Sequence, residues 1–143
     1  MTEHTSIFQK NAAVYVQELD GAIRRWQQQA APLRGKRVVS YHPDLIYFAE
    51  RFGIECFGTI EQRPGIDPAP SHIAELIRRM REAKVEIVVR ELHYPVGLAE
   101  TVAKTTGARL VELPAMAGGL PGTKTYINFI DYNIRTLLKA VTE

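Results

Sequence analysis

Acidic and histidine side chains follow four apolar segments of this 143-residue sequence, at the points where those segments end. His42 comes after the first segment, Glu61 after the second, Glu91 and His93 after the third, and Glu112 comes in the fourth. Imidazole and carboxylate groups together suit zinc, manganese or iron. Taken singly, each residue also has an ordinary structural explanation, such as capping the next helix. A metal site therefore depends on a fold that brings them together.

His42 is the strongest candidate, because a strand is expected to end and a helix to begin around it. An apolar run ends at Tyr41, and a new periodic pattern of apolar residues starts after Pro43 and Asp44. Nucleophilic catalysis has little support, since the sequence has no G-x-S-x-G elbow. The apolar neighbours of Cys56 indicate a buried thiol with a raised pKa. We therefore expect a binding role for His42 and no enzymatic activity.

A glycine-rich segment, residues 117–125, is a second candidate site, for phosphate. It lies between an expected strand and an expected helix and contains Lys124 and Thr125. A P-loop needs lysine directly after its last glycine, whereas Thr123 separates Gly122 from Lys124. A helix N-terminus can still bind an anion. The alternative function is therefore a free-standing cytosolic doubly wound domain that binds a nucleotide or a phosphorylated metabolite at this loop.

The apolar periodicity predicts helices and short strands in alternation. A long helix is expected from Ser6 to Gln29, and further helices at residues 44–52, 72–83, 96–105 and 126–141. Strands are expected at residues 36–41, 54–60, 85–89 and 108–113. Short, uniformly apolar strands are typical of a parallel sheet covered on both faces. The sequence thus predicts an α/β fold, a three-layer doubly wound domain with a four-stranded parallel sheet, and ligands bind such sheets beyond the carboxyl ends of the strands.

Composition and charge exclude several classes of protein. The 18 basic and 16 acidic side chains leave a net charge of +2, which is too small to indicate binding to nucleic acid or to an anionic membrane. No run of residues approaches a membrane span, and residues 1–10 lack the sections of a signal peptide. The chain is expected to be either cytosolic or a piece of a longer, exported protein.

Three segments, residues 37–60, 68–113 and 126–141, together resemble the C-terminal lobe of the substrate-binding proteins of zinc and manganese ABC importers. Residues 11–20 are similar to that family's long linking helix. The resemblance implies a linking helix at residues 1–35, a lobe at residues 36–143 and an absent N-terminal lobe. It further implies a periplasmic or cell-surface location for the full-length parent, and delivery of the metal to an ABC transporter permease without enzymatic chemistry.

On this resemblance His42 falls on the first metal ligand of the lobe, which is a histidine in zinc-binding members and often a glutamate in manganese-binding members. Zinc is therefore expected, with manganese as the alternative. Glu61, Glu91 and His93 are expected in the cleft. The family's aspartate ligand is missing near Pro114, so the site in this chain is expected to be incomplete. Exposed apolar residues on the first helix also favour a homodimer of the isolated lobe.

Overall fold

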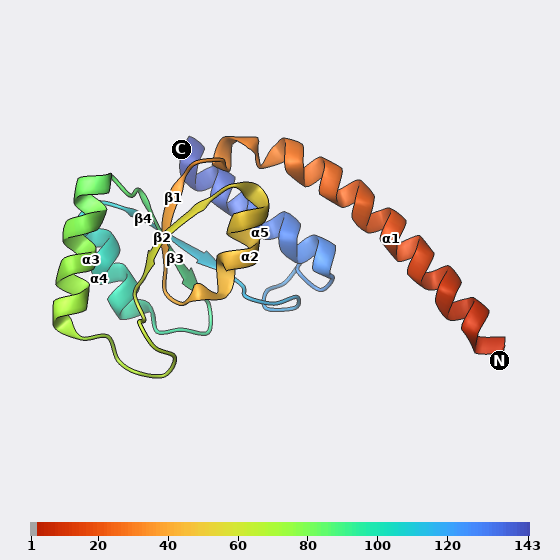
Figure 1. The fold of residues 1–143 in the computed structure, drawn as a ribbon, viewed down its shortest axis with the longest axis horizontal. Coiled ribbons are helices and arrows are strands. Elements are labelled where there is room, and N and C mark those ends of the chain that lie inside the picture. The colour runs from red at the N-terminus through yellow and green to blue at the C-terminus, as the bar shows by residue number, and fades with distance from the viewer. Residues whose placement is uncertain (1–2) are drawn as a thin grey trace.

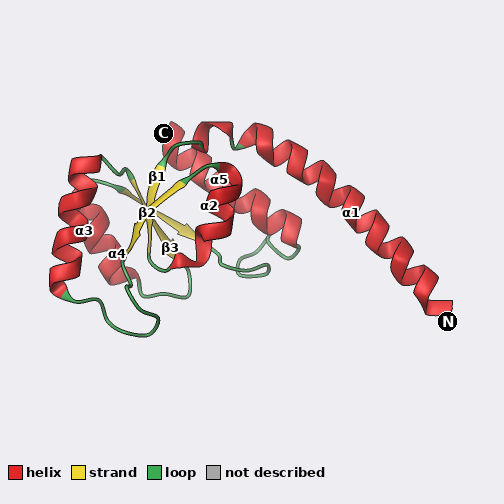
Figure 2. Cartoon of the chain, in the orientation of Figure 1, coloured by secondary structure: helices red, strands yellow, loops and turns green. Residues whose placement is uncertain are grey.

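A computed structural model describes residues 3–143 as a four-stranded parallel sheet between two layers of helices (Figures 1 and 2). The strands, in the spatial order β2-β1-β3-β4, are β1 (Arg37–Ser40), β2 (Glu55–Thr59), β3 (Ile87–Glu91) and β4 (Arg109–Leu113). The α-helices are α1 (Glu3–Gln29), α2 (Ile46–Phe52), α3 (Pro70–Ala83), α4 (Val96–Thr106) and α5 (Tyr126–Thr142). The predicted doubly wound α/β fold is confirmed.

The strand side chains alternate between the two faces, so the sheet has an apolar core on each side. Val38 and Val89 belong to the core under α1, α2 and α5. Val39 and Val88 belong to the core under α3 and α4. Because the central strands β1 and β3 are covered on both faces, apolar and polar residues do not alternate along them.

Glycine ends two of the helices where the sequence predicts. Gly53 (φ 70°) and Gly107 (φ 76°) adopt the left-handed conformation after α2 and α4, which glycine adopts without steric cost. The predicted starts of two other helices are wrong. The first helix already includes Glu3, ahead of Ser6. Helix α3 begins at Pro70, two residues before its predicted start, because a missing N–H costs nothing at the first helical position.

The pairing of β1 with β2 contains a bulge. Val38 pairs with Cys56, but Val39 pairs with Gly58, so Phe57 is an extra residue on β2. The strand β2 lies at the edge of the sheet, and Cys56 is exposed there. The prediction of a buried thiol is therefore wrong, although partial desolvation does raise the pKa of Cys56.

The two halves of α1 differ. Near its C-terminal end, buried Trp26 donates a hydrogen bond from its indole to Asp131 of α5, and Arg25 forms an ion pair with the same carboxylate at 3.2 Å. The N-terminal half projects away from the rest of the chain (Figure 1) and carries the exposed apolar residues Ile7, Phe8, Val14, Tyr15 and Val16. Across the described residues, neither this helix nor any other is long and apolar enough to cross a membrane.

Candidate metal centre

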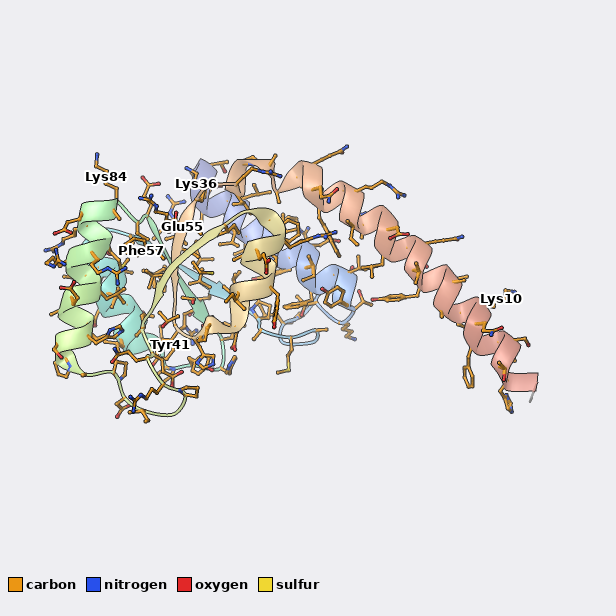
Figure 3. All side chains as sticks on the ribbon, in the orientation of Figure 1. Lys10, Lys36, Tyr41, Glu55, Phe57 and Lys84 are labelled. Atoms are coloured by element: carbon orange, nitrogen blue, oxygen red, sulfur yellow. The ribbon has the colours of Figure 1, made fainter. Side chains whose placement is uncertain are left out.

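The carboxyl ends of the strands lie at one edge of the sheet, and the first three of them bring His42, Glu61 and Glu91 into contact. Figure 3 shows this edge through Tyr41, which follows β1 and lies at the opposite end of the strand from Lys36. The parallel direction of the strands accounts for this arrangement, because each strand delivers its last residues to the same side.

The hydrogen bond between His42 and Glu61 orients the imidazole. The Nδ1 atom of His42 is bonded to Oε2 of Glu61, and Oε1 of the same carboxylate accepts the N–H of Gly65 at 2.8 Å. The bond from His42 holds the pKa of Glu61 below its usual range, with help from Gly65 and against the effect of burial. An ionised carboxylate can only accept. The carboxylate therefore favours a proton on Nδ1, and a neutral imidazole with this tautomer binds a metal through Nε2.

Glu91 supports His42 from inside the protein. Its side chain is fully buried, and Oε2 accepts the backbone N–H of His42 at 3.3 Å. Burial raises the pKa of Glu91 to about 7, the negative charge of Asp44 adds to this rise, and the hydrogen bond from His42 opposes it. Its other oxygen, Oε1, has no hydrogen-bond partner within residues 3–143. Glu91 therefore lies behind the histidine and holds its backbone.

Asp44 is the site residue that the sequence analysis does not identify. It lies in the short 3-10 turn Pro43–Leu45, and its Oδ1 is 3.6 Å from Nε2 of His42. Its Oδ2 is 3.5 Å from Nε2 of His93. Asp44 thus connects the two histidines. The signal that could have found it is its position two residues after His42, at the start of the same turn.

Aromatic rings pack beside His42. The ring of Tyr94 stacks on His42 with 5.2 Å between centroids and on Tyr41 with 5.0 Å. His93 packs against the same Tyr94 at 4.2 Å and is half exposed. Since Tyr94 contacts both histidines, the loop after β3 sets how His93 approaches the site.

Glu112 lies in a separate ion pair. It binds the guanidinium of Arg90, whose side chain is only 11% exposed. The same guanidinium donates to the backbone carbonyls of Leu92, at 3.2 Å, and Tyr94, at 2.6 Å. Arg90 therefore fixes the loop that carries His93, and Glu112 balances its charge.

The glycine-rich loop after β4 is held by its own side chains. The buried hydroxyl of Thr123 donates to the carbonyl of Leu120 at 2.8 Å. Thr125 caps α5 by accepting the N–H of Asn128 at 3.1 Å. A side chain already binds one N–H of this helix N-terminus, which weakens the phosphate-binding alternative.

The chemistry of the donors at the sheet edge suits zinc, because zinc takes imidazole nitrogen and carboxylate oxygen. Among the described residues, however, no three histidine, cysteine, aspartate or glutamate side chains lie close enough together to hold a metal ion. The geometry is therefore that of part of a site, with His42 as its best-oriented donor.

A doubly wound lobe with an oriented imidazole and carboxylates at the carboxyl edge of its sheet has the features of a metal-receptor lobe. The chain belongs to the family described as zinc-uptake complex component A, periplasmic, whose sequence profile matches residues 1–140. This membership confirms the resemblance seen in the sequence and does not favour the nucleotide-binding alternative.

Two curated relatives illustrate the family. The high-affinity zinc uptake system protein ZnuA of Brucella abortus is 28% identical over 107 residues, which cover 75% of this chain and 32% of the relative. The zinc-binding lipoprotein AdcA of Streptococcus pneumoniae is 24% identical over 139 residues, covering 91% of this chain and 27% of the relative. The chain thus spans about a third of the length of these proteins or less.

Solved structures agree with the fold. The laminin-binding protein Lmb of Streptococcus agalactiae, described as an adhesin with metal-transporting activity, superposes with a TM-score of 0.83 at 26% identity, covering 98% of this chain and 54% of that protein. The substrate-binding protein FpvC of Pseudomonas aeruginosa, in complex with Mn²⁺, has a TM-score of 0.77 at 24% identity, covering 94% of this chain and 51% of that protein. At that identity FpvC supports the fold alone.

Proposed function

We propose that this chain is one lobe of a zinc-uptake receptor and that His42 is the ligand it contributes to a metal held between two lobes. The observation that carries the proposal is the hydrogen bond from Nδ1 of His42 to Glu61, which leaves Nε2 free at the carboxyl edge of the sheet. The zinc-uptake family supports zinc as the cargo, and manganese is the alternative. The lobe binds and releases the ion without chemical change, so its function is not enzymatic.

The proposal extends to the rest of the receptor. On this proposal the linking helix and its turn span residues 1–35, of which the structure describes residues 3–35, and the lobe spans residues 36–143. The exposed apolar side chains on the N-terminal half of α1 support this division, because a second lobe would cover them. The chain spans about half of the solved structures it resembles, which leaves room for such a lobe. The full-length parent would then act in the periplasm or at the cell surface and deliver its metal to an ABC transporter permease.

Titration calorimetry with zinc tests the site in the 143-residue chain. The His42→Ala variant should bind zinc at least about tenfold more weakly than the parent chain. The matched control is His4→Ala, which removes an imidazole from the projecting half of α1 and should leave the zinc affinity unchanged. An unchanged affinity in His42→Ala would show that the site is assigned wrongly. Parallel titrations with manganese and ATP rank the metals and test the nucleotide alternative.

In the isolated chain the exposed face of α1 would instead pair two copies. Phe8 is 67% exposed and Val16 is 53% exposed, and burying such side chains favours association. Light scattering should give the mass of two chains, and Phe8→Glu should shift it towards one. A mass of one chain for the parent sequence at high concentration would contradict the dimer.

A further inference from the structure

Asp44 lies at the ring nitrogen of His42 that Glu61 leaves free. We infer that Asp44 is the second metal ligand of this lobe, so that one zinc ion binds between its carboxylate and Nε2 of His42. The inference rests on the proposed function, because it completes the same half of the same site. It assigns a ligand role to a residue in the turn after β1, next to the histidine in sequence.

The separation of the two donor atoms supports this role. Oδ1 of Asp44 is 3.6 Å from Nε2 of His42, which is longer than an ordinary hydrogen bond. Two donors that each lie about 2.1 Å from one tetrahedral zinc ion are roughly 3.4 Å apart. The observed gap is therefore close to the distance that an ion would impose, and only a small side-chain rotation is needed.

His93 holds the other side of the same carboxylate. Its Nε2 is 3.5 Å from Oδ2 of Asp44, and its ring packs on Tyr94. Residues that contact the far oxygen or nitrogen of a ligand commonly fix its direction towards the metal. His93 is thus a positioning residue for Asp44, as Glu61 is for His42.

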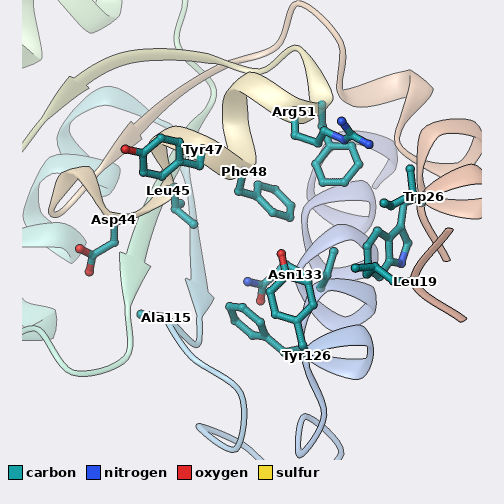
Figure 4. A pocket seen from close by; sticks show the side chains of 14 residues that line it. Leu19, Trp26, Asp44, Leu45, Tyr47, Phe48, Arg51, Ala115, Tyr126 and Asn133 are labelled. Carbon is teal, nitrogen blue, oxygen red and sulfur yellow. The ribbon is translucent and has the colours of Figure 1, made fainter. Parts of the chain in front are cut away.

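Two buried side-chain oxygens lie at the same carboxyl edge of the sheet as Asp44. Oε1 of Glu91, beside His42, and Oδ1 of Asn133 are both buried and have no hydrogen-bond partner within the described chain. Asn133, Asp44 and Ala115 line one cavity of about 480 Å³ (Figure 4), whose other lining side chains are mostly apolar and do not include His42. Buried acceptors are costly when unpaired. Together with the carboxylates around His42, they make this edge favourable for positive charge.

The charge of Asp44 can be removed with little change of shape. In zinc calorimetry of the 143-residue chain, Asp44→Asn should lower the affinity at least about tenfold, whereas Asp20→Asn, an exposed aspartate on α1, should not change it. An affinity lost in His42→Ala but kept in Asp44→Asn would overturn the inference and leave the proposed function intact. An affinity kept in His42→Ala would instead overturn the proposed function.

A second variant separates a lost ligand from a damaged fold. Ala115 lines the same cavity as Asp44, so Ala115→Asp returns a carboxylate to it from the loop after β4. The double variant Asp44→Asn/Ala115→Asp should recover zinc affinity relative to Asp44→Asn, with both variants melting cooperatively by circular dichroism. Weak binding by a well-folded double variant, equal to that of Asp44→Asn, would count against a carboxylate ligand in this cavity.

Discussion

The imidazole of His42 and the carboxylate of Glu61 are hydrogen-bonded to each other, although they follow different strands. The bond determines which ring nitrogen carries the proton, and therefore which one can bind a metal. Glu61 is itself fixed by the N–H of Gly65 at 2.8 Å. The tautomer of His42 thus depends on Glu61, a residue that need not contact the metal.

Replacing Glu61 by alanine should change the tautomer of His42. Without its acceptor, the proton on Nδ1 is no longer favoured, and part of the population should carry it on Nε2. Nitrogen NMR of the imidazole measures this directly, and zinc affinity should fall about tenfold. The control is Glu55→Ala, which removes an exposed carboxylate that pairs with Arg37. A tautomer ratio equal to that of the parent chain would contradict the role of Glu61.

Glu91 should make the folded chain less stable as the pH rises. Burial raises its folded-state pKa to about 7, above the unfolded value, so its favourable contribution is present at low pH and is lost between about pH 4.5 and pH 7. The loss should be about 2 to 3 kcal/mol. Urea unfolding from pH 5 to pH 8 should show this decline in the parent chain and a flatter profile in Glu91→Gln. Parallel profiles for the two proteins would exclude an elevated pKa.

Arg90→Ala should loosen the loop after β3. The substitution removes the donor to the carbonyls of Leu92 and Tyr94 and leaves Glu112 unpaired, at a cost of about 2 kcal/mol. Amide hydrogen exchange should speed up at residues 92–94. Arg78→Ala is the matched control, because its ion pairs lie on the exposed face of α3, where solvent screens them and they contribute little to stability. Equal effects of the two variants would argue against a special role for Arg90.

The two halves of α1 should differ sharply in their effect on stability. Trp26 is 4% exposed and bonded to Asp131, so Trp26→Ala should cost about 3 kcal/mol or more. Phe8 is 67% exposed, and Phe8→Ala should cost less than about 0.5 kcal/mol in dilute solution. Urea unfolding of both variants checks this. Similar losses would mean that the projecting half also packs on the lobe.

Much of the fold could be predicted from local signals. Apolar runs located the strands, and Gly53 and Gly107 located the ends of two helices, because a left-handed residue after a helix strongly favours glycine. The exposure of Cys56 could not be predicted this way. It depends on β2 being an edge strand, and strand order is set by packing of the whole chain.

For the candidate site, the sequence could predict only those residues that lie at the carboxyl end of a strand. The position of His42 after β1 followed from the parallel sheet, and so did the positions of Glu61 and Glu91. The approach of Asp44 to His42 depends on the backbone of a short 3-10 turn and on side-chain rotamers, which apolar periodicity does not encode. The pairing of Glu112 with Arg90 depends on a neighbouring strand in the same way.

The bulge in β2 decides which side chain becomes the neighbour of His42. Val38 lies level with Cys56, an offset of 18 positions, whereas Ser40 lies level with Thr59, an offset of 19. Carried on to His42, the shifted register arrives at Glu61, and the backbone bond from Glu61 N–H to the carbonyl of Tyr41, at 2.9 Å, follows it. The unshifted register would arrive at Ile60. If Phe57 paired with Val39 and the bulge were lost, a hydrocarbon would therefore replace the acid beside the histidine, so that one extra residue on the edge strand determines the chemistry of the site.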